Sequence, residues 1–176
     1  LAVAAGKRWF GFETTKGRVL YINAELPDYD LQLRLKKLAE SMGLDRVPDT
    51  LDIMHLRGSP KAIRELSRPI EERQKAIKTK YALVCPDPLY AFNGNDENDN
   101  SEMAQFMLSL QTLAEETDAA IWITHHFSKG NKANTEHIDR GSGAGSMARA
   151  VDCYMTLTRH QEDGAYVAEF SVRSFA

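Results

Sequence analysis

The sequence is poor in cysteine and has no long apolar run. Its 176 residues include only Cys85 and Cys153, each inside an apolar stretch, a setting typical of reduced, buried thiols rather than of a disulfide framework or a metal site. No apolar stretch approaches the roughly 18 residues of a membrane span, and the start of the chain lacks the charged beginning and apolar middle of a signal peptide. We therefore expect a soluble, cytoplasmic protein with no membrane partner.

Positive charge is not in surplus either. The 22 Lys and Arg residues are outnumbered by 25 Asp and Glu residues, which leaves a net charge of −3. A protein with this balance can contact nucleic acid only through local patches or through assembly into a ring. With 43% hydrophobic and 27% charged residues, the chain has the size and composition of one compact domain.

A third absence concerns phosphate binding. The pattern GxxxxGK[ST], whose backbone amides and lysine cradle phosphates, occurs nowhere in the sequence. The first residues, LAVAAG, are typical of the last turns of a helix that Gly6 closes in a left-handed conformation. We expect the chain to begin inside a helix, so that residues 1–176 form one domain truncated at its N-terminus.

Segments of strand length alternate with segments of helical periodicity. Strands are expected over 18–25, 51–56, 81–89 and 119–126, and helices over 28–42, from 67 to about 80, and over 103–116. Two more strands, near 151–158 and 166–173, follow a polar stretch over 128–145 that we expect to be a mobile loop or lid. This order predicts an α/β fold with a mostly parallel, doubly wound sheet and a C-terminal antiparallel hairpin.

The helix expected over 28–42 carries the clearest boundary signals. Asp28 is placed to cap its N-terminus, and Gly43 is placed to end it. Its buried face is expected to be formed by the apolar residues that recur at helical spacing, namely Leu31, Leu35, Leu38 and Met42.

Reactive polar side chains follow three of the expected parallel strands. These are Glu25, Asp87 and the pair His125 and His126. Because ligands of doubly wound sheets bind at the carboxyl ends of the strands, the three endings together indicate a functional site.

Each of these residues has a chemical and a structural interpretation. Asp87, followed by Pro88, fits a carboxylate that holds the water shell of Mg²⁺, although Asp before proline also opens ordinary turns. Glu25 is suited to polarise a water for attack on a γ-phosphate, or is a solvated carboxylate ahead of a helix. His125 and His126 point to opposite faces of a strand, so we expect one to sense phosphate and the other to pack in the core.

The ordered set of motifs resembles a known family. The succession VLYINAEL, ALVCPDPLYAFNGNDENDN, WITHHFSKGN and DRGSGAGSMARAVD is similar to the RepA-type hexameric helicase ATPases of plasmids and phages, within the RecA-like group of P-loop NTPases. The resemblance covers about residues 1 to 160. It implies a RecA-like core that hydrolyses ATP with Mg²⁺, contacts single-stranded DNA without sequence preference, and assembles into a homo-oligomer, which we expect to be a ring.

The resemblance also implies residue roles. Glu25 matches the catalytic glutamate, Asp87 the Walker B aspartate that serves Mg²⁺, and His126, or else His125, the phosphate-sensing position. Basic residues of the family reach the nucleotide of a neighbouring subunit, and here the candidates are Arg149, Arg140 and Lys129. DNA contact is expected in the loop over 128–142 through Lys129, Lys132 and Arg140, a loop that is otherwise a disordered surface segment.

Two departures from the family pattern have consequences. Pro86 stands where the family has a β-branched residue, which removes one ladder hydrogen bond and can bend the strand. The missing GxxxxGK[ST] deprives these 176 residues of much of the family's nucleotide affinity. We expect the parent protein to carry that motif within about 20 residues before Leu1.

Three other functions remain open from the sequence. A metal-dependent hydrolase could use Asp87, His125, His126, His137 and Asp139, but no HxxxH or HxH spacing supports it. A non-enzymatic assembly domain would have no need of Glu25 beside Asp87. A recombinase-like or regulatory RecA-like ATPase differs from a helicase in whether single-stranded DNA stimulates ATP turnover.

Overall fold

The computed structural model describes residues 1–59, 61–93, 100–126, 147, 150–174 of the chain. Its helices are α1 (Ala2–Ala5), α2 (Asp28–Ser41), α3 (Ser67–Ile77) and α4 (Asn100–Thr117), with short 3-10 turns η1 (Ile63–Glu65) and η2 (Leu89–Ala91). Its strands are β1 (Val19–Asn23), β2 (Leu51–His55), β3 (Leu83–Asp87), β4 (Ala120–Ile121), β5 (Cys153–Arg159) and β6 (Tyr166–Val172). These elements form two compact units, one from the described parts of 1–94 and 108–125, the other from those of 95–107 and 126–176.

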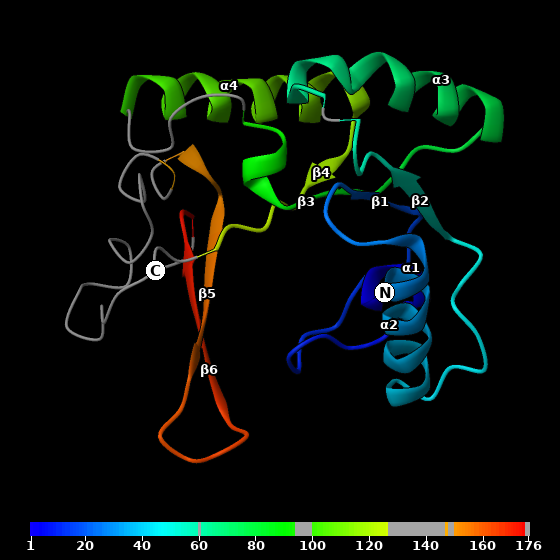
Figure 1. Ribbon diagram of the computed structural model, residues 1–176, viewed down its shortest axis with the longest axis vertical. Helices are drawn as coiled ribbons and strands as arrows, with labels where there is room; N and C mark the ends of the chain where they lie inside the picture. The colour runs from blue at the N-terminus through cyan, green and yellow to red at the C-terminus, as the bar shows by residue number, and fades with distance from the viewer. Residues whose placement is uncertain (60, 94–99, 127–146, 148–149, 175–176) are drawn as a thin grey trace. The chain divides into compact units, whose positions relative to one another are not determined.

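The first unit is built on a parallel sheet. Its four strands lie in the order β2-β1-β3-β4, with α3 and the second half of α4 along one face and α1 and α2 on the other (Figure 1). The central strand β1 buries Val19, Leu20 and Ile22 almost completely, as expected of a parallel strand covered on both sides. The predicted doubly wound α/β sheet is confirmed.

The second unit contains the antiparallel hairpin expected at the end of the chain. Strand β5 pairs with β6 from Cys153↔Val172 to Arg159↔Tyr166, and Gly164, at φ 78°, lies in the connecting turn. Cys153 is exposed, so the prediction that it is buried was wrong, because a two-stranded ribbon does not bury both of its faces. Cys85 in β3 is half-buried, and burial raises the pKa of its thiol to about 12.

Helix α2 has the predicted extent but not the predicted cap. It spans Asp28–Ser41, and Pro27 is its N-cap residue, with no side-chain capping bond. The Asp28 carboxylate instead lies 2.7 Å from Nδ1 of His55, at the end of β2. The first carboxylate of the helix therefore joins α2 to the sheet rather than capping the helix.

The buried face of α2 also differs from the predicted one. Leu31 and Ala39 are buried, Leu35 is half-buried, and Leu38 is 52% exposed. At about 100° per residue, Leu35 lies midway between Leu31 and Ala39 around the helix, whereas Leu38 is displaced by about 60° from that midline. Leu38 thus falls at the rim of the buried face, although its spacing from Leu31 is helical.

Proline shortens the pairing between β3 and β4. The amide of Trp122 donates to the carbonyl of Val84 at 2.9 Å. In a parallel ladder the return bond to the Trp122 carbonyl would come from the amide of residue 86, and Pro86 has no amide hydrogen. The strand expected over 119–126 is accordingly regular only at Ala120–Ile121, and the predicted loss of one ladder bond falls on this pair of strands.

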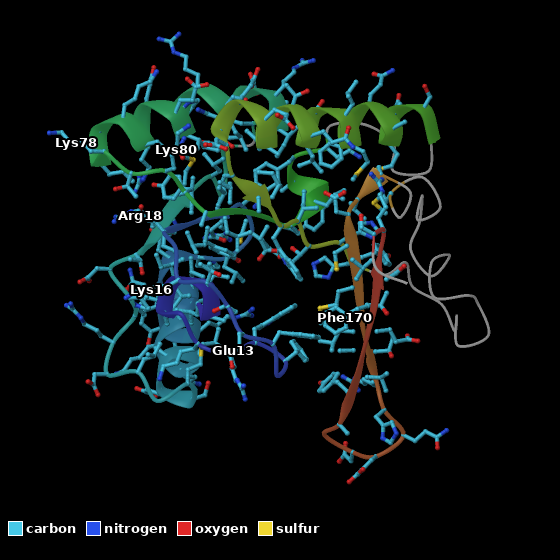
Figure 2. All side chains as sticks on the ribbon, turned by 180° about the vertical axis from the view of Figure 1, so that it is seen from behind. Glu13, Lys16, Arg18, Lys78, Lys80 and Phe170 are labelled. Atoms are coloured by element: carbon cyan, nitrogen blue, oxygen red, sulfur yellow. The ribbon has the colours of Figure 1, made fainter. Side chains whose placement is uncertain are left out.

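The remaining boundaries differ from the predictions by a few residues. Helix α3 ends at Ile77, because Lys78 takes the left-handed conformation, so Lys78 and Lys80 lie beyond the helix (Figure 2). Helix α4 begins at Asn100, three residues before the predicted start. Within the part of the chain that the structure describes, no helix is both long and apolar enough to cross a membrane.

A network of charged and phenolic groups joins elements at the amino edge of the sheet. Arg18, which is labelled in Figure 2, donates to both carboxylate oxygens of Asp52, at 2.7 and 3.0 Å. The Tyr81 hydroxyl donates to Asp52 at 2.8 Å, and Arg73 lies 3.3 Å from the same carboxylate. Burial by itself raises the pKa of Asp52, but hydrogen bonds from Arg18, Tyr81 and Arg73 outweigh it and lower that pKa below the ordinary 3.8. The network therefore ties β2, α3 and the segments that lead into β1 and β3 around one ionised carboxylate.

Candidate active site at the carboxyl edge of the sheet

Asp87 is the last residue of β3 and lies at the carboxyl edge of the first unit. It is in register with Asn23, the last residue of β1. Its two carboxylate oxygens each accept a hydrogen bond, one from the hydroxyl of Tyr21 and one from the hydroxyl of Thr124. Tyr21 comes from β1 and Thr124 from the segment after β4, so β1 and this segment together orient the carboxylate.

The protonation state of Tyr21 is that of a hydrogen-bond donor. Burial, together with the bond to Asp87, raises the pKa of its phenol. Tyr21 therefore keeps its proton at neutral pH and donates a hydrogen bond to the Asp87 carboxylate. Two fixed donors hold the plane of that carboxylate while leaving it further lone pairs, since an ionised carboxylate has about four acceptor positions.

Glu25 follows β1 at the same edge. The amide of Ala24, just before it, donates to the carbonyl of Asp87 at 3.0 Å, so the two chain segments leave the sheet together. The Glu25 side chain is exposed and is hydrogen-bonded to the hydroxyl of Tyr90 in η2. Burial, this bond and the negative charges of Glu25 and Asp87 raise the pKa of Tyr90. Both carboxylates are therefore close enough to the Tyr90 phenol to affect its charge.

The two histidines fall in different units. His125 is half-buried and closes the second stretch of the first unit, while His126 is exposed and belongs to the second unit. Neither lies in a regular strand, because β4 ends at Ile121. Which of them reaches a phosphate stays a prediction.

The other predicted site residues lie outside the described residues. These are Lys129, Lys132, Arg140 and Arg149, as well as His137 and Asp139 of the alternative metal site.

Three hydroxyl-bearing residues at the edge, Tyr21, Thr124 and Tyr90, were missed from the sequence. Tyr21 occupies what looks like an ordinary apolar position of a strand. Only the register between β1 and β3 reveals that it faces Asp87.

The donor atoms at this edge are suited to a hard cation. The Asp87 carboxylate and its hydroxyl partners are all oxygen, and Mg²⁺ is usually held by one or two carboxylates together with water and substrate phosphates. Across residues 1–59, 61–93, 100–126 and the described parts that follow, no group of three or more His, Cys, Asp or Glu side chains is placed to hold a metal ion. The oxygen donors at this edge are of the kind that Mg²⁺ prefers, and the described residues offer no ligand set of the kind that zinc requires.

A protein-family model matches about three quarters of the chain. The family model described as AAA domain matches residues 1–132. That match includes β1 to β4 and all three predicted strand endings of the carboxyl edge.

Two solved structures are similar to this chain. One is described as an ATPase domain, with 14% identity, a TM-score of 0.57, and coverage of 80% of this chain and 59% of that one. The other is a DnaB-like replicative helicase, solved in a study of its interactions with primase, with 13% identity, a TM-score of 0.62, and coverage of 84% of this chain and 42% of that one. This chain thus spans less than two thirds of either protein. At these identities the likeness concerns the fold alone, and it agrees with the predicted α/β core with a mostly parallel sheet.

Proposed function

This chain belongs to the AAA domain family, and on that premise we propose that it forms the ATP-hydrolysing core of a replicative-helicase-type protein. ATP and Mg²⁺ are its proposed ligands, with single-stranded DNA and further copies of the chain as partners. The fold shared with a solved ATPase domain and with a DnaB-like helicase supports this choice among the families of nucleotide-binding folds.

One observation supports the proposal most strongly. Glu25 and Asp87 leave adjacent parallel strands at the carboxyl edge, where the Ala24 amide bonds to the Asp87 carbonyl at 3.0 Å. A hydrolase of nucleoside triphosphates needs one carboxylate near the metal and another that orients the attacking water. Two carboxylates held apart on neighbouring strands meet this requirement, whereas an assembly domain has no use for them.

The proposed roles follow from the surroundings of each group. Asp87, held by Tyr21 and Thr124, would bind Mg²⁺ through its water shell. Glu25 would orient a water for attack on the terminal phosphate, with Tyr90 as its hydrogen-bond partner. Bound Mg²⁺ supplies charge stabilisation of the phosphates. The motif GxxxxGK[ST] does not occur in the 176 residues, so the proposal assigns no phosphate cradle to them.

The proposal predicts separable effects on binding and turnover. In the complete gene product, Glu25→Gln should keep ATP binding and lower turnover by about 10² or more, because the amide preserves shape but cannot act as a base. Binding is measured with a fluorescent nucleotide, and turnover by phosphate release.

A matched control uses the same chemical change elsewhere. Glu116 is exposed near the end of α4 and is not at the carboxyl end of any strand. Glu116→Gln should leave ATP binding and ATP turnover unchanged. Turnover at the wild-type rate in the Glu25→Gln protein would remove Glu25 from the mechanism.

A further inference from the structure

The end of β1 carries a buried side-chain amide. Asn23 is 1% exposed and is the last strand residue before the turn that contains Glu25. Its Oδ1 accepts from the amide of Leu26 at 2.9 Å and, more weakly, from the amide of Glu25 at 3.4 Å. Its Nδ2 donates to the carbonyl of Leu26 at 2.7 Å.

A neighbouring histidine supports this orientation of the amide. Nδ1 of His55 lies 3.4 Å from Asn23 Nδ2 but 2.7 Å from the Asp28 carboxylate. The shorter contact favours the tautomer in which Nδ1 carries hydrogen and donates to Asp28. Nδ1 then cannot accept from Asn23, whose amide nitrogen turns to the Leu26 carbonyl.

These bonds fix the turn by means of one side chain. The Ala24 amide still bonds to the Asp87 carbonyl, but residues 25 and 26 lie beyond the sheet ladder. Their backbone groups need other partners where they are shielded from water. Asn23 supplies them for both polar backbone groups of Leu26, in the manner of a side chain that mimics a turn. Its main chain is anchored as well, because its carbonyl accepts from the Leu56 amide at 2.8 Å.

We propose that Asn23 is a positioning residue that sets the direction in which Glu25 leaves the sheet. The inference rests on the proposed function for its kinetic consequence, but not for its structural part. Glu25 is exposed and its carboxylate has Tyr90 as a partner, so the backbone on which it stands determines where that carboxylate can reach. Asn23 does not touch the nucleotide in this account. It acts through Glu25.

The structural part is tested by hydrogen exchange. The chosen variant is Asn23→Leu, which keeps volume but removes both the donor and the acceptor. In the complete gene product it should raise the hydrogen-exchange rate of the Leu26 amide by about tenfold or more, because an amide that has lost its hydrogen bond is exposed to solvent more often. Ile22→Ala is the matched control, because Ile22 is fully buried in the same strand but its side chain has no polar atom to bond the turn. Ile22→Ala should raise exchange rates along the strand, with no specific increase at the Leu26 amide.

The kinetic part is tested by comparing variants. Asn23→Leu should lower kcat for ATP about tenfold while the KM stays within about twofold, since a small misplacement of a reacting group costs turnover more than binding. Asn23→Ser, whose hydroxyl can still accept from the turn, should restore much of the loss. In protein that already carries Glu25→Gln, adding Asn23→Leu should lower kcat by less than about twofold. The effects of residues that act through one another are not additive.

The outcomes distinguish the inference from the proposed function. Unchanged exchange at Leu26, a loss of kcat equal to that of Ile22→Ala, or full additivity with Glu25→Gln would each overturn the role of Asn23. If the gene product hydrolyses no ATP, the proposed function fails, and the exchange experiment alone then decides whether Asn23 holds the turn.

Discussion

At the scale of single residues, the environment of Asp87 determines what this carboxylate can do. The hydroxyls of Tyr21 and Thr124 bond to different oxygens of the same carboxylate. Partners that orient a metal-serving group contribute to metal affinity, and removing one typically weakens binding by about 10- to 100-fold. The two hydroxyls are therefore part of the proposed Mg²⁺ site although neither is a strong metal ligand.

Removing either hydroxyl should raise the Mg²⁺ requirement. Tyr21→Phe and Thr124→Val preserve shape, and each should increase the Mg²⁺ concentration for half-maximal ATP turnover by about tenfold. The measurement is a Mg²⁺ titration of phosphate release by the complete gene product. Tyr29→Phe is the control, because Tyr29 is 75% exposed on α2. An unchanged Mg²⁺ requirement in both variants would show that Asp87 needs neither donor.

Glu25 and Asp87 could be predicted as site residues from the sequence, because a carboxylate directly after an apolar segment of strand length is a recognisable pattern. It missed Tyr21, Thr124 and Asn23, because their importance depends on register and on turn geometry. Asn23 is a polar residue in an apolar run, which is a signal, but its partners at Leu26 appear only once the chain has turned.

At the scale of elements, the Asp52 network links β2 to its neighbours. Its carboxylate is 13% exposed and receives bonds from Arg18 and Tyr81. Because the folded-state pKa of Asp52 is lowered from 3.8, its contribution to stability is fully present above about pH 4, and is lost as pH falls from there through the folded-state pKa. An amide at this position would lack that pH dependence.

Asp52→Asn should lower the free energy of unfolding at pH 7 by about 2 kcal/mol, since hydrogen bonds to charged groups contribute in that range. The difference from wild type should shrink as the pH falls below about 4. Denaturant unfolding at several pH values measures both. Asp49→Asn is the control, because Asp49 and Arg46 are paired 2.6 Å apart but are both more than three quarters exposed, and such pairs contribute little. A difference between Asp52→Asn and wild type that stays constant below about pH 4 contradicts the account.

Element order and type were predictable, whereas element ends were less so. The alternation of apolar and amphipathic segments was enough to predict β1, β2, β3, α2 and the β5–β6 hairpin. The length of β4 was not, because it depends on the missing amide of Pro86 across the sheet. The buried face of α2 also differed, since Ala39 rather than Leu38 is buried.

At the scale of the whole molecule, the proposed function predicts a site shared between copies. RecA-like ATPases that share a site between subunits form head-to-tail interfaces, which close into rings or extend as filaments. Arg149, outside the described residues, precedes β5 in the sequence and is the first candidate for a residue acting across such an interface. The alternative from the sequence is a stabilising role at the end of the short helix expected over GAGSMARA, where a cation contributes about 0.3–1 kcal/mol.

Mixing subunits separates the two roles of Arg149. Arg149→Ala subunits added to wild type should depress ATP turnover below the value expected from dilution, because each mutant subunit deprives a wild-type neighbour of its arginine. Arg159→Ala, a change at an exposed position of β5, should give simple dilution. Simple dilution by Arg149→Ala, accompanied by a lower melting temperature, would indicate helix stabilisation instead.

Steady-state ATP turnover by the complete gene product tests most directly whether this chain is the core of a helicase-type ATPase. Turnover should require Mg²⁺ and should rise when single-stranded DNA is added, because helicase ATPases couple hydrolysis to movement on DNA. Turnover that DNA does not change would point to a regulatory RecA-like ATPase. The absence of turnover with Mg²⁺, ATP and single-stranded DNA all present would contradict the account.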